Sequence, residues 1–192
     1  MGYPAMKPTM NAQDYLAWED TQLDKHEFVN GEIVDMAGAE ERHVVVSMNV
    51  AFALRQHLSG TPCRAYMAEM KLWCATQDSY FYPDVMVTCS AADHANSKIK
   101  HEPLLLVEVL SPSTAAYDRG AKFAHYRQIE SLQELAFIDP DTRCTDVYRR
   151  GADGLWVLHP FQADEGLEFA SVKLRMSAPT LFADLDAPSA PG

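Results

Sequence analysis

The sequence lacks any apolar run of the roughly 18 to 20 residues that a membrane-spanning helix needs. Its first residues, MGYPAMKPTM, also lack the apolar stretch of a secretion signal. We therefore expect a cytoplasmic protein that does not bind membranes. No repeat or linker-like segment divides the 192 residues, which can bury one sizeable core. We expect a single domain, residues 1–192, with an ordered core over about residues 9–185.

Positive charge is scarce. The chain has 16 Lys and Arg residues against 27 Asp and Glu residues, which gives a formal net charge of −11. Proteins that hold nucleic acid mainly through phosphate contacts are usually basic. The balance argues against tight, nonspecific DNA binding. It is compatible with a local basic groove, or with a metal ion that carries its own positive charge to a phosphate.

Paired cysteine spacings are absent as well. Cys63, Cys74, Cys89 and Cys144 are widely separated and show neither the spacing of a zinc site nor that of a thiol oxidoreductase. Most of them stand in apolar segments. We expect four reduced cysteines in the core.

Helical segments are indicated by capping residues and by apolar residues three or four positions apart. They are a short helix capped by Thr9 or Asn11, a helix over residues 41–58, a helix over residues 115–129 and a short helix capped by Ser177. The apolar side of the second is expected to carry Val45, Met48, Phe52 and Leu58, or their neighbours.

Strand patterns fill the segments between these helices. Asn30-Gly31 separates two alternating runs and predicts a hairpin, because both residues tolerate the positive φ of a type I′ turn. Further strands are expected over residues 63–75, 79–90 and 103–111, with a loop at 91–102, and in ELAFIDP, TDVYRR and LWVLHPF. The order predicts an α/β fold of the α+β type, with a central mixed β-sheet flanked by helices.

Glu108 interrupts the apolar strand PLLLVEVLSPST. Period-two alternation places it on the same face as Leu106 and Leu110, near the end of the strand. A buried carboxylate costs several kcal/mol unless a cation, hydrogen-bond donors or a proton compensate it. Glu108 therefore requires a partner.

Asp84 is a second acid within an apolar strand pattern, and it follows Pro83, which cannot donate a backbone hydrogen bond. Two carboxylates in neighbouring strands repel each other unless a cation lies between them. Oxygen ligands of this kind suit Mg²⁺ or Mn²⁺. The pair Asp84 and Glu108 therefore predicts a divalent metal site.

These acids stand in a series of segments that resembles the Uma family of proposed restriction endonucleases, within the PD-(D/E)XK nuclease superfamily. The resemblance extends over most of residues 9–185, and its segments are DYLAWED, KHEFVNGEIVDMAGA, CRAYMAEMKL, YPDVMV, LLLVEVLSPST, DRGAKFAHYR and a Leu-Gln-Glu-Leu step before a strand. It implies a restriction-endonuclease-like core. It also implies a Mg²⁺-dependent endonuclease, with Mn²⁺ as an alternative ion, that hydrolyses DNA phosphodiester bonds by metal-activated water.

The resemblance assigns roles to particular residues. It implies that Asp84 and Glu108 bind the metal, with the backbone carbonyl of Val109 as a further ligand, and that Lys122 orients or activates water. Glu32 receives a supporting role. Residues of lower rank, for contacts to substrate or to the ligands, are His43, Lys71 and Tyr126.

One departure from the superfamily pattern leaves alternatives open. Leu110 stands where the pattern places its lysine, and we expect Lys122 on the following helix to replace it. Glu108 could instead form a plain salt bridge with Lys122 or Arg119. The whole chain could be a catalytically silent nuclease-like module that binds a protein or nucleic acid, and a glycosidase that uses both acids ranks last. Because cutting both DNA strands needs two sites, we also expect a homodimer.

Overall fold

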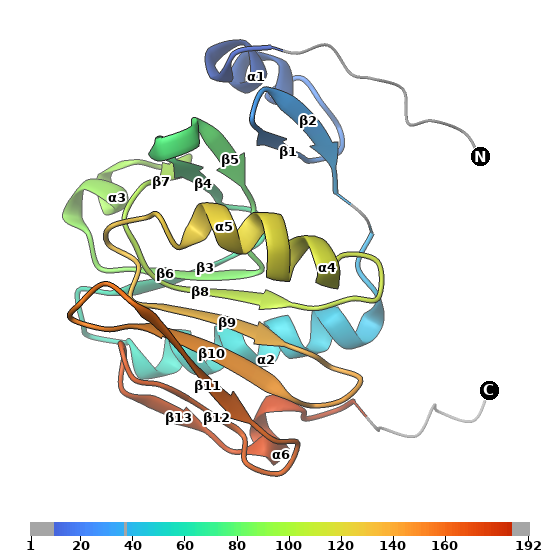
Figure 1. The fold of residues 1–192 in the computed structure, drawn as a ribbon, viewed down its shortest axis with the longest axis vertical. Helices are drawn as coiled ribbons and strands as arrows, with labels where there is room; N and C mark the ends of the chain where they lie inside the picture. Colours follow the sequence, from blue (N-terminus) through green and yellow to red (C-terminus); the bar gives the residue numbers. More distant parts are fainter. Residues whose placement is uncertain (1–9, 37, 186–192) are drawn as a thin grey trace.

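The computed structural model describes residues 10–36 and 38–185, which form two mixed β-sheets with helices around them (Figure 1). The larger sheet has the strand order β11-β10-β9-β8-β6-β3, with the bounds Trp156–Phe161, Thr145–Arg150, Glu134–Ile138, Pro103–Val109, Val85–Thr88 and Arg64–Met67. Its strands pair antiparallel except β8 and β9, which run parallel.

The smaller sheet has the order β2-β1-β5-β4-β7, with the bounds Glu32–Asp35, His26–Val29, Ser79–Phe81, Lys71–Cys74 and Ile99–Lys100. A separate hairpin pairs β12 with β13, at Leu167–Phe169 and Leu174–Met176. The helices are α1 to α6, with the bounds Ala12–Glu19, Glu41–His57, Ala91–Ala95, Ala115–Tyr117, Phe123–Tyr126 and Ala178–Leu181. A π-helical turn, Asp118–Lys122, joins α4 to α5, and a short 3-10 turn follows β4.

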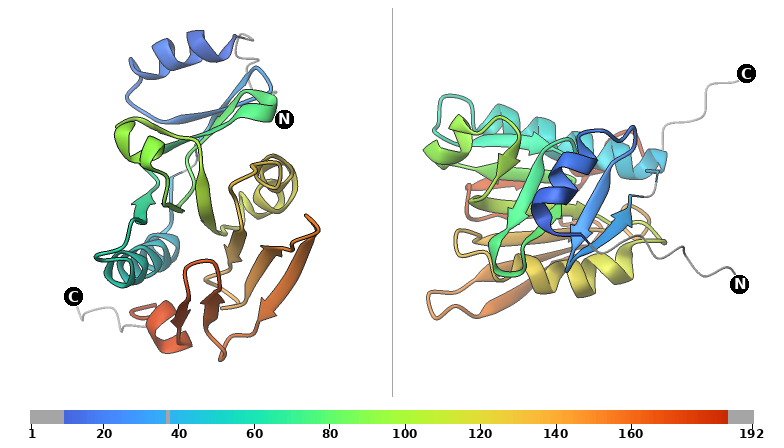
Figure 2. Two further views of the ribbon diagram at one scale, coloured as in Figure 1. Left: turned by 90° about the vertical axis from the view of Figure 1, so that its left-hand side faces the viewer. Right: turned by 90° about the horizontal axis from the view of Figure 1, so that it is seen from above.

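Both faces of the larger sheet are covered, which explains why β8 reads as a nearly continuous apolar run. Helix α2 lies on one face, and the segment from α4 to α5 lies on the other (Figure 2). Along β8 the buried side chains alternate between the two cores: Leu105 and Val107 pack on the α2 side, whereas Leu106 packs on the α5 side. The expected mixed sheet flanked by helices is confirmed.

Two local signals near the N-terminus are also confirmed. Asn30 and Gly31 form the two-residue turn between β1 and β2 with φ values of 53° and 88°. Asn11 caps α1, since its side chain accepts a hydrogen bond from the backbone N–H of Asp14 at 2.9 Å. Thr9, the alternative cap, lies outside the described residues.

The segments 63–75 and 79–90 are each two strands rather than one, and this prediction was wrong. The first gives β3 and β4 and the second gives β5 and β6, with one strand of each pair in each sheet. Pro83 lies at the second break, where its missing N–H cannot continue a ladder. Within residues 63–90 the chain therefore crosses twice between the sheets, and Asp84 lies at the second of these crossings.

Two further predictions need correction. The expected loop at 91–102 contains α3, whose start is capped by the side chain of Ser90, and the strand β7. On α2, the buried face carries Val46, Val50 and Leu54, whereas Met48 and Phe52 are 53% and 66% exposed. The apolar residues on this helix occur on both faces, so their spacing did not identify the buried one.

No helix in the described part of the chain is long and apolar enough to cross a membrane.

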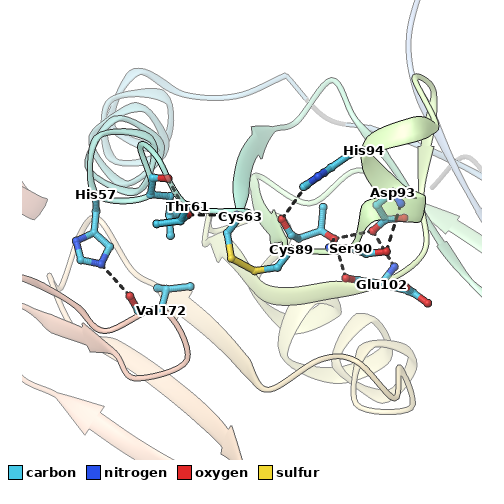
Figure 3. Close-up of a disulfide and its surroundings, with 11 residues drawn as sticks. His57, Thr61, Cys63, Cys89, Ser90, Asp93, His94, Glu102 and Val172 are labelled. Carbon is cyan, nitrogen blue, oxygen red and sulfur yellow. Dashed lines mark hydrogen bonds between the residues drawn. A yellow bond between two sulfur atoms is a disulfide. The ribbon is translucent and has the colours of Figure 1, made fainter.

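Cys63 and Cys89 form a disulfide, which corrects the expectation of four reduced cysteines (Figure 3). The antiparallel register of β3 and β6 pairs Arg64 with Thr88, so the cysteines that flank this pair meet although 26 positions separate them in sequence. Cys74 and Cys144 are free. Burial raises the pKa of the Cys74 thiol to about 12, so this cysteine stays protonated and unreactive in the folded protein.

We expect the disulfide to stabilise the fold by about 2 to 4 kcal/mol, because it restricts the unfolded chain. Reduction, or the variant Cys63→Ser, should lower the urea midpoint by a corresponding amount, and Cys144→Ser should leave it unchanged. Thiol counting in denaturant should find two reactive cysteines before reduction and four after it. Four reactive thiols without reductant would contradict the assignment.

Candidate active site

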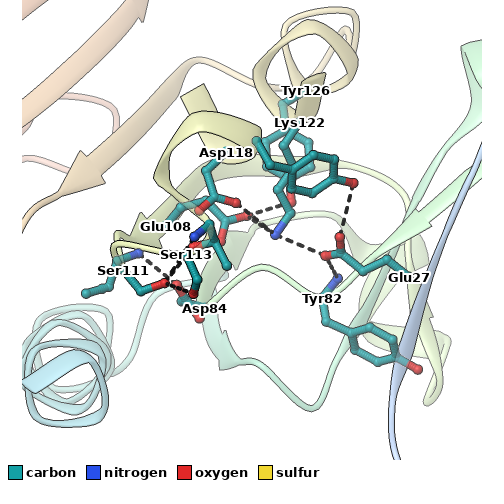
Figure 4. Close-up of polar contacts among 12 residues, drawn as sticks. Glu27, Tyr82, Asp84, Glu108, Ser111, Ser113, Asp118, Lys122 and Tyr126 are labelled. Carbon is teal, nitrogen blue, oxygen red and sulfur yellow. Dashed lines mark hydrogen bonds and ion pairs between the residues drawn. The ribbon is translucent and has the colours of Figure 1, made fainter. Parts of the chain in front are cut away.

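The buried acids meet where the two sheets approach each other (Figure 4). Glu108 lies near the end of β8, and Asp84 directly precedes β6. Glu27 comes from β1 in the smaller sheet, and Lys122 from the π-helical turn after α4. Since Val85 of β6 pairs with Val107 of β8, the same register brings Asp84 opposite Glu108. The site thus depends on four separate segments of the chain.

Glu108 is 2% exposed and is held by two donors. The hydroxyl of Tyr126 donates a hydrogen bond to its Oε1 at 2.7 Å, and Lys122 Nζ lies 3.1 Å from the same oxygen. The side chain therefore faces α4 and α5, as the alternation along the strand predicts.

Asp84 is fixed beside Glu108 by the neighbouring strand. Its Oδ2 accepts a hydrogen bond from the backbone N–H of Val109 at 2.7 Å and lies 3.1 Å from Nε2 of His43 on α2. Burial lowers the pKa of His43, but the hydrogen bond and the charge of Asp84 outweigh burial and raise that pKa above its ordinary value. Asp84 and His43 therefore form a charge-assisted pair at the edge of the site.

Lys122 stands at the centre of the carboxyl groups. Its Nζ is 3.0 Å from Glu27, 3.1 Å from Glu108 and 3.7 Å from Asp118, and the residue is only 6% exposed. The turn that carries both Asp118 and Lys122 is π-helical, a rare conformation that occurs frequently at functional sites.

The charges of this cluster do not balance. Burial raises the pKa of Glu108 well above its ordinary value, and the nearby Asp84, Asp118 and Glu27 raise it further against the opposing effect of Lys122. Burial would lower the pKa of Lys122, but the surrounding carboxylates outweigh it and hold this pKa well above its ordinary value. Lys122 thus faces several acids, and burial and their mutual repulsion raise the pKa of Glu108 and also that of Asp118.

The cluster opens into a cavity of about 410 Å³. The charged side chains in its lining are more often acidic than basic; the acids are Glu27, Asp35, Asp84, Glu108 and Asp118, and the bases are His43 and Lys122. Other parts of the wall come from residues 34–36 and 38–39 and from the turn between β8 and α4, with Ser111, Ser113 and Thr114.

The donor set fits a hard divalent cation. In the part of the chain that the structure describes, Asp84 accepts its hydrogen bonds through one carboxylate oxygen, Oδ2. Glu108 likewise accepts its hydrogen bond through one oxygen, Oε1. Within residues 10–36 and 38–185, no three His, Cys, Asp or Glu side chains are grouped so that they could hold a metal ion. Mg²⁺ does not require such a group, because it keeps several waters and uses one or two carboxylates. The excess of carboxyl groups over cations favours its binding.

The structure brings most of the residues singled out in the sequence to this cavity. Asp84, Glu108, Val109, Lys122 and His43 line it. Tyr126 reaches it through its hydrogen bond to Glu108.

Two of the remaining residues lie elsewhere. Glu32 is exposed on β2 and is not part of the cavity wall. Lys71 lies with its Nζ over the rings of Tyr15 and Tyr82, 5.5 and 5.8 Å from their centroids.

Glu27 was not predicted from the sequence, although the hairpin of β1 and β2 supplies this acid to the cavity. It is 3% exposed and stands between His26 and Phe28, which are also buried. Its carboxylate accepts hydrogen bonds from the backbone N–H of Tyr82 at 3.3 Å and from the hydroxyl of Tyr117 at 3.4 Å. Glu108 was identified because it interrupts a continuous apolar run, whereas Glu27 follows the polar residues Lys25 and His26, so its burial could not be read from the sequence in the same way.

The chain matches a family model described as "Putative restriction endonuclease" over residues 12–178. It is similar to two uncharacterized proteins of Synechocystis sp. One is 34% identical over 178 residues, which cover 93% of this chain and 94% of that protein. The other is 33% identical over 169 residues, which cover 86% and 95%.

The fold is similar to that of a crystal structure from Anabaena variabilis, described as a "putative nuclease belonging to DUF820". The TM-score is 0.74 at 18% sequence identity, over 90% of this chain and 97% of that chain. At this identity the likeness shows the fold.

We expect Glu108→Gln to gain stability relative to wild type as the pH rises, because burial and the neighbouring acids raise the pKa of Glu108 and make its ionised form unfavourable in the folded protein. Because the pKa of Glu108 is raised in the folded state, this residue contributes its full stabilisation of the fold only below its ordinary pKa of 4.5. The contribution is lost as the pH rises toward the raised pKa. Glutamine does not ionise, so its advantage over Glu108 should grow from about pH 4.5 upward.

Urea unfolding of both proteins across this pH range measures the difference. Glu32→Gln is the matched control, because the same change at an exposed site should give a difference that does not vary in this way. Parallel stability curves for wild type and Glu108→Gln would contradict the assignment of a raised pKa.

Proposed function

The chain belongs to the Uma2 family of putative restriction endonucleases, and from this we propose that it is a Mg²⁺-dependent endonuclease that hydrolyses DNA phosphodiester bonds, with Mn²⁺ as an alternative ion. The observation that supports the proposal most is the meeting of Asp84 and Glu108, from different strands, beside the buried Lys122. That the chain acts as a cytoplasmic homodimer stays a prediction from the sequence.

In this proposal Asp84 and Glu108 hold the metal ion, together with the carbonyl of Val109. When bound, the ion supplies a Lewis acid that activates water and neutralises charge on the phosphate. Both carboxyl groups bind a cation in their ionised form, and the burial and neighbouring acids that raise the pKa of Glu108 oppose its ionisation. Metal binding should therefore be weaker at low pH.

Lys122 has two tasks in this proposal. Its ammonium group, held by Glu27 and Glu108, orients the attacking water and stabilises the negative charge that develops on the phosphate. It also keeps the neighbouring carboxylates together before the ion arrives. Because Lys122 is buried, its side chain is held in place without reorganisation during the reaction.

Three other groups orient the ligands. His43 and the N–H of Val109 hold one oxygen of Asp84, and Tyr126 holds one oxygen of Glu108. Such partners fix the orientation of metal ligands and typically contribute 10- to 100-fold to affinity or activity. Their positions favour a metal site over a plain ion pair, since a salt bridge between Glu108 and Lys122 does not require Asp84.

We expect freshly purified protein to nick plasmid DNA with Mg²⁺ or Mn²⁺ and to lose this activity in EDTA. Asp84→Asn and Glu108→Gln should reduce cleavage below detection, and Lys122→Met should reduce kcat by about 10²- to 10³-fold, the loss typical of a group that stabilises developing charge. Circular dichroism should show that each variant is folded. If neither ion supports cleavage, and Mn²⁺ produces no thermal shift in wild type, the silent-module alternative is favoured.

We expect Glu27→Gln to reduce cleavage by about 10- to 100-fold, because it removes a carboxylate that holds Lys122. Glu32→Gln makes the same chemical change on the facing strand of the hairpin and should leave the rate unchanged. Rates at saturating Mn²⁺ compare the two variants. Impairment in Glu32→Gln alone would instead restore the supporting role that the sequence suggested for Glu32.

A further inference from the structure

We infer that the cavity accepts an unpaired DNA strand, with single nucleotides entering the site, rather than the backbone of an intact duplex. This inference rests on the proposed nuclease function and concerns its substrate. Three observations carry it: the position of the reacting groups in a cavity wall, the pairing of the basic side chains around the cavity, and the position of Tyr117.

The groups proposed to act on the phosphate lie in the wall of a cavity rather than on an open surface. Glu108 and Lys122 are buried, Asp84 is partly exposed, and the cavity that they line measures about 410 Å³. Pockets of roughly 300 to 1,000 Å³ enclose a small ligand. An unpaired nucleotide can bend into such a space, whereas a phosphate of an intact duplex is fixed on a rigid surface, with its sugar and paired base behind it.

Three basic side chains near the cavity, in the part of the chain that the structure describes, are engaged with acids. Arg42 and Arg119 are adjacent in sequence to His43 and Asp118, which line the cavity. Lys25 lies beside a third lining residue, Met36, whose N–H donates a hydrogen bond to the carbonyl of Lys25. All three basic side chains are ion-paired with acids, in the pairs Lys25–Glu69, Arg42–Asp141 and Arg119–Asp146. A duplex carries about one negative charge per 1.7 Å of its axis and binds through many phosphate contacts. A single strand has a lower charge density and suits these paired side chains better.

Tyr117 provides an aromatic surface in the cavity wall. It is partly exposed, and its hydroxyl donates a hydrogen bond to Glu27, which anchors the ring beside the site. The other tyrosine of the wall, Tyr82, is buried and donates its hydroxyl hydrogen to Glu19. Aromatic side chains bind unpaired bases by stacking, without sequence preference. We therefore assign Tyr117 as the positioning residue for a base next to the reacting phosphate.

The first test compares three DNAs of one sequence: a single strand, its full duplex, and a duplex with an unpaired bubble. In Mn²⁺, the single strand and the bubble should be cut about 10- to 100-fold faster than the duplex, because unpairing costs a few kcal/mol. In Ca²⁺, fluorescence anisotropy of the same DNAs should show tighter binding of the unpaired ones.

The outcomes separate this inference from the proposed function. Equal or faster cleavage of the duplex overturns the inference and leaves the nuclease function intact. Cleavage of none of the three overturns the nuclease function, and binding in Ca²⁺ then decides the inference: preference for the duplex, or no binding, overturns it.

The second test concerns Tyr117. Tyr117→Ala should raise KM for the single strand by about 5- to 150-fold, the range that stacking on one aromatic residue provides. Its kcat should change less. Tyr117→Phe keeps the ring and loses only the hydrogen bond to Glu27, so its KM should stay close to that of wild type. Equal effects of both variants, or no effect of Tyr117→Ala, would overturn the role of the ring.

Discussion

The ammonium group of Lys122 lies at the centre of a cluster of buried carboxyl groups, and the site depends on it. Glu27, Glu108 and Asp118 approach it from three segments of the chain. Burying charges in this way is usually less stable than an apolar core of the same volume. The fold retains an arrangement in which carboxyl groups outnumber cations, and such an arrangement is better explained by binding a further cation than by stability.

The fold brings these groups together through interruptions of regular structure. The chain leaves the smaller sheet after β5 and enters the larger one at β6, and Asp84 lies at this crossing next to Pro83. A π-helical turn between α4 and α5 carries Asp118 and Lys122. Each irregularity supplies a side chain to one cavity, while the regular strands hold their spacing. The family and the fold identify the chain as a nuclease-like protein, and the cavity is its candidate active site.

Much of this could be predicted from the sequence where a local signal was sufficient. Glu108 was identified because a single acid interrupts a buried strand, and the mixed sheet followed from the order of the elements. Lys122 was identified through the resemblance to the family rather than through any local pattern. Glu27 was missed because Lys25 and His26 precede it, so that no continuous apolar run marks its strand as buried.

The other wrong predictions concern features that depend on how strands pair and helices pack in the folded chain. Strands that change sheet look continuous when both halves are apolar, as in residues 79–90. The disulfide between Cys63 and Cys89 depends on the register of β3 with β6, and a spacing of 26 positions does not reveal it. The buried face of α2 could not be predicted because apolar residues also occupy its exposed face.

The proposed function requires that Asp84 and Glu108 form a binding site for a divalent cation. A crystal soaked in Mn²⁺ tests it most directly, because anomalous scattering locates the ion independently of any activity. We expect an anomalous peak between the two carboxylates, next to the carbonyl of Val109, and no such peak in Glu108→Gln. A wild-type crystal that shows no peak there, or that binds Mn²⁺ only at the surface, would contradict this metal site.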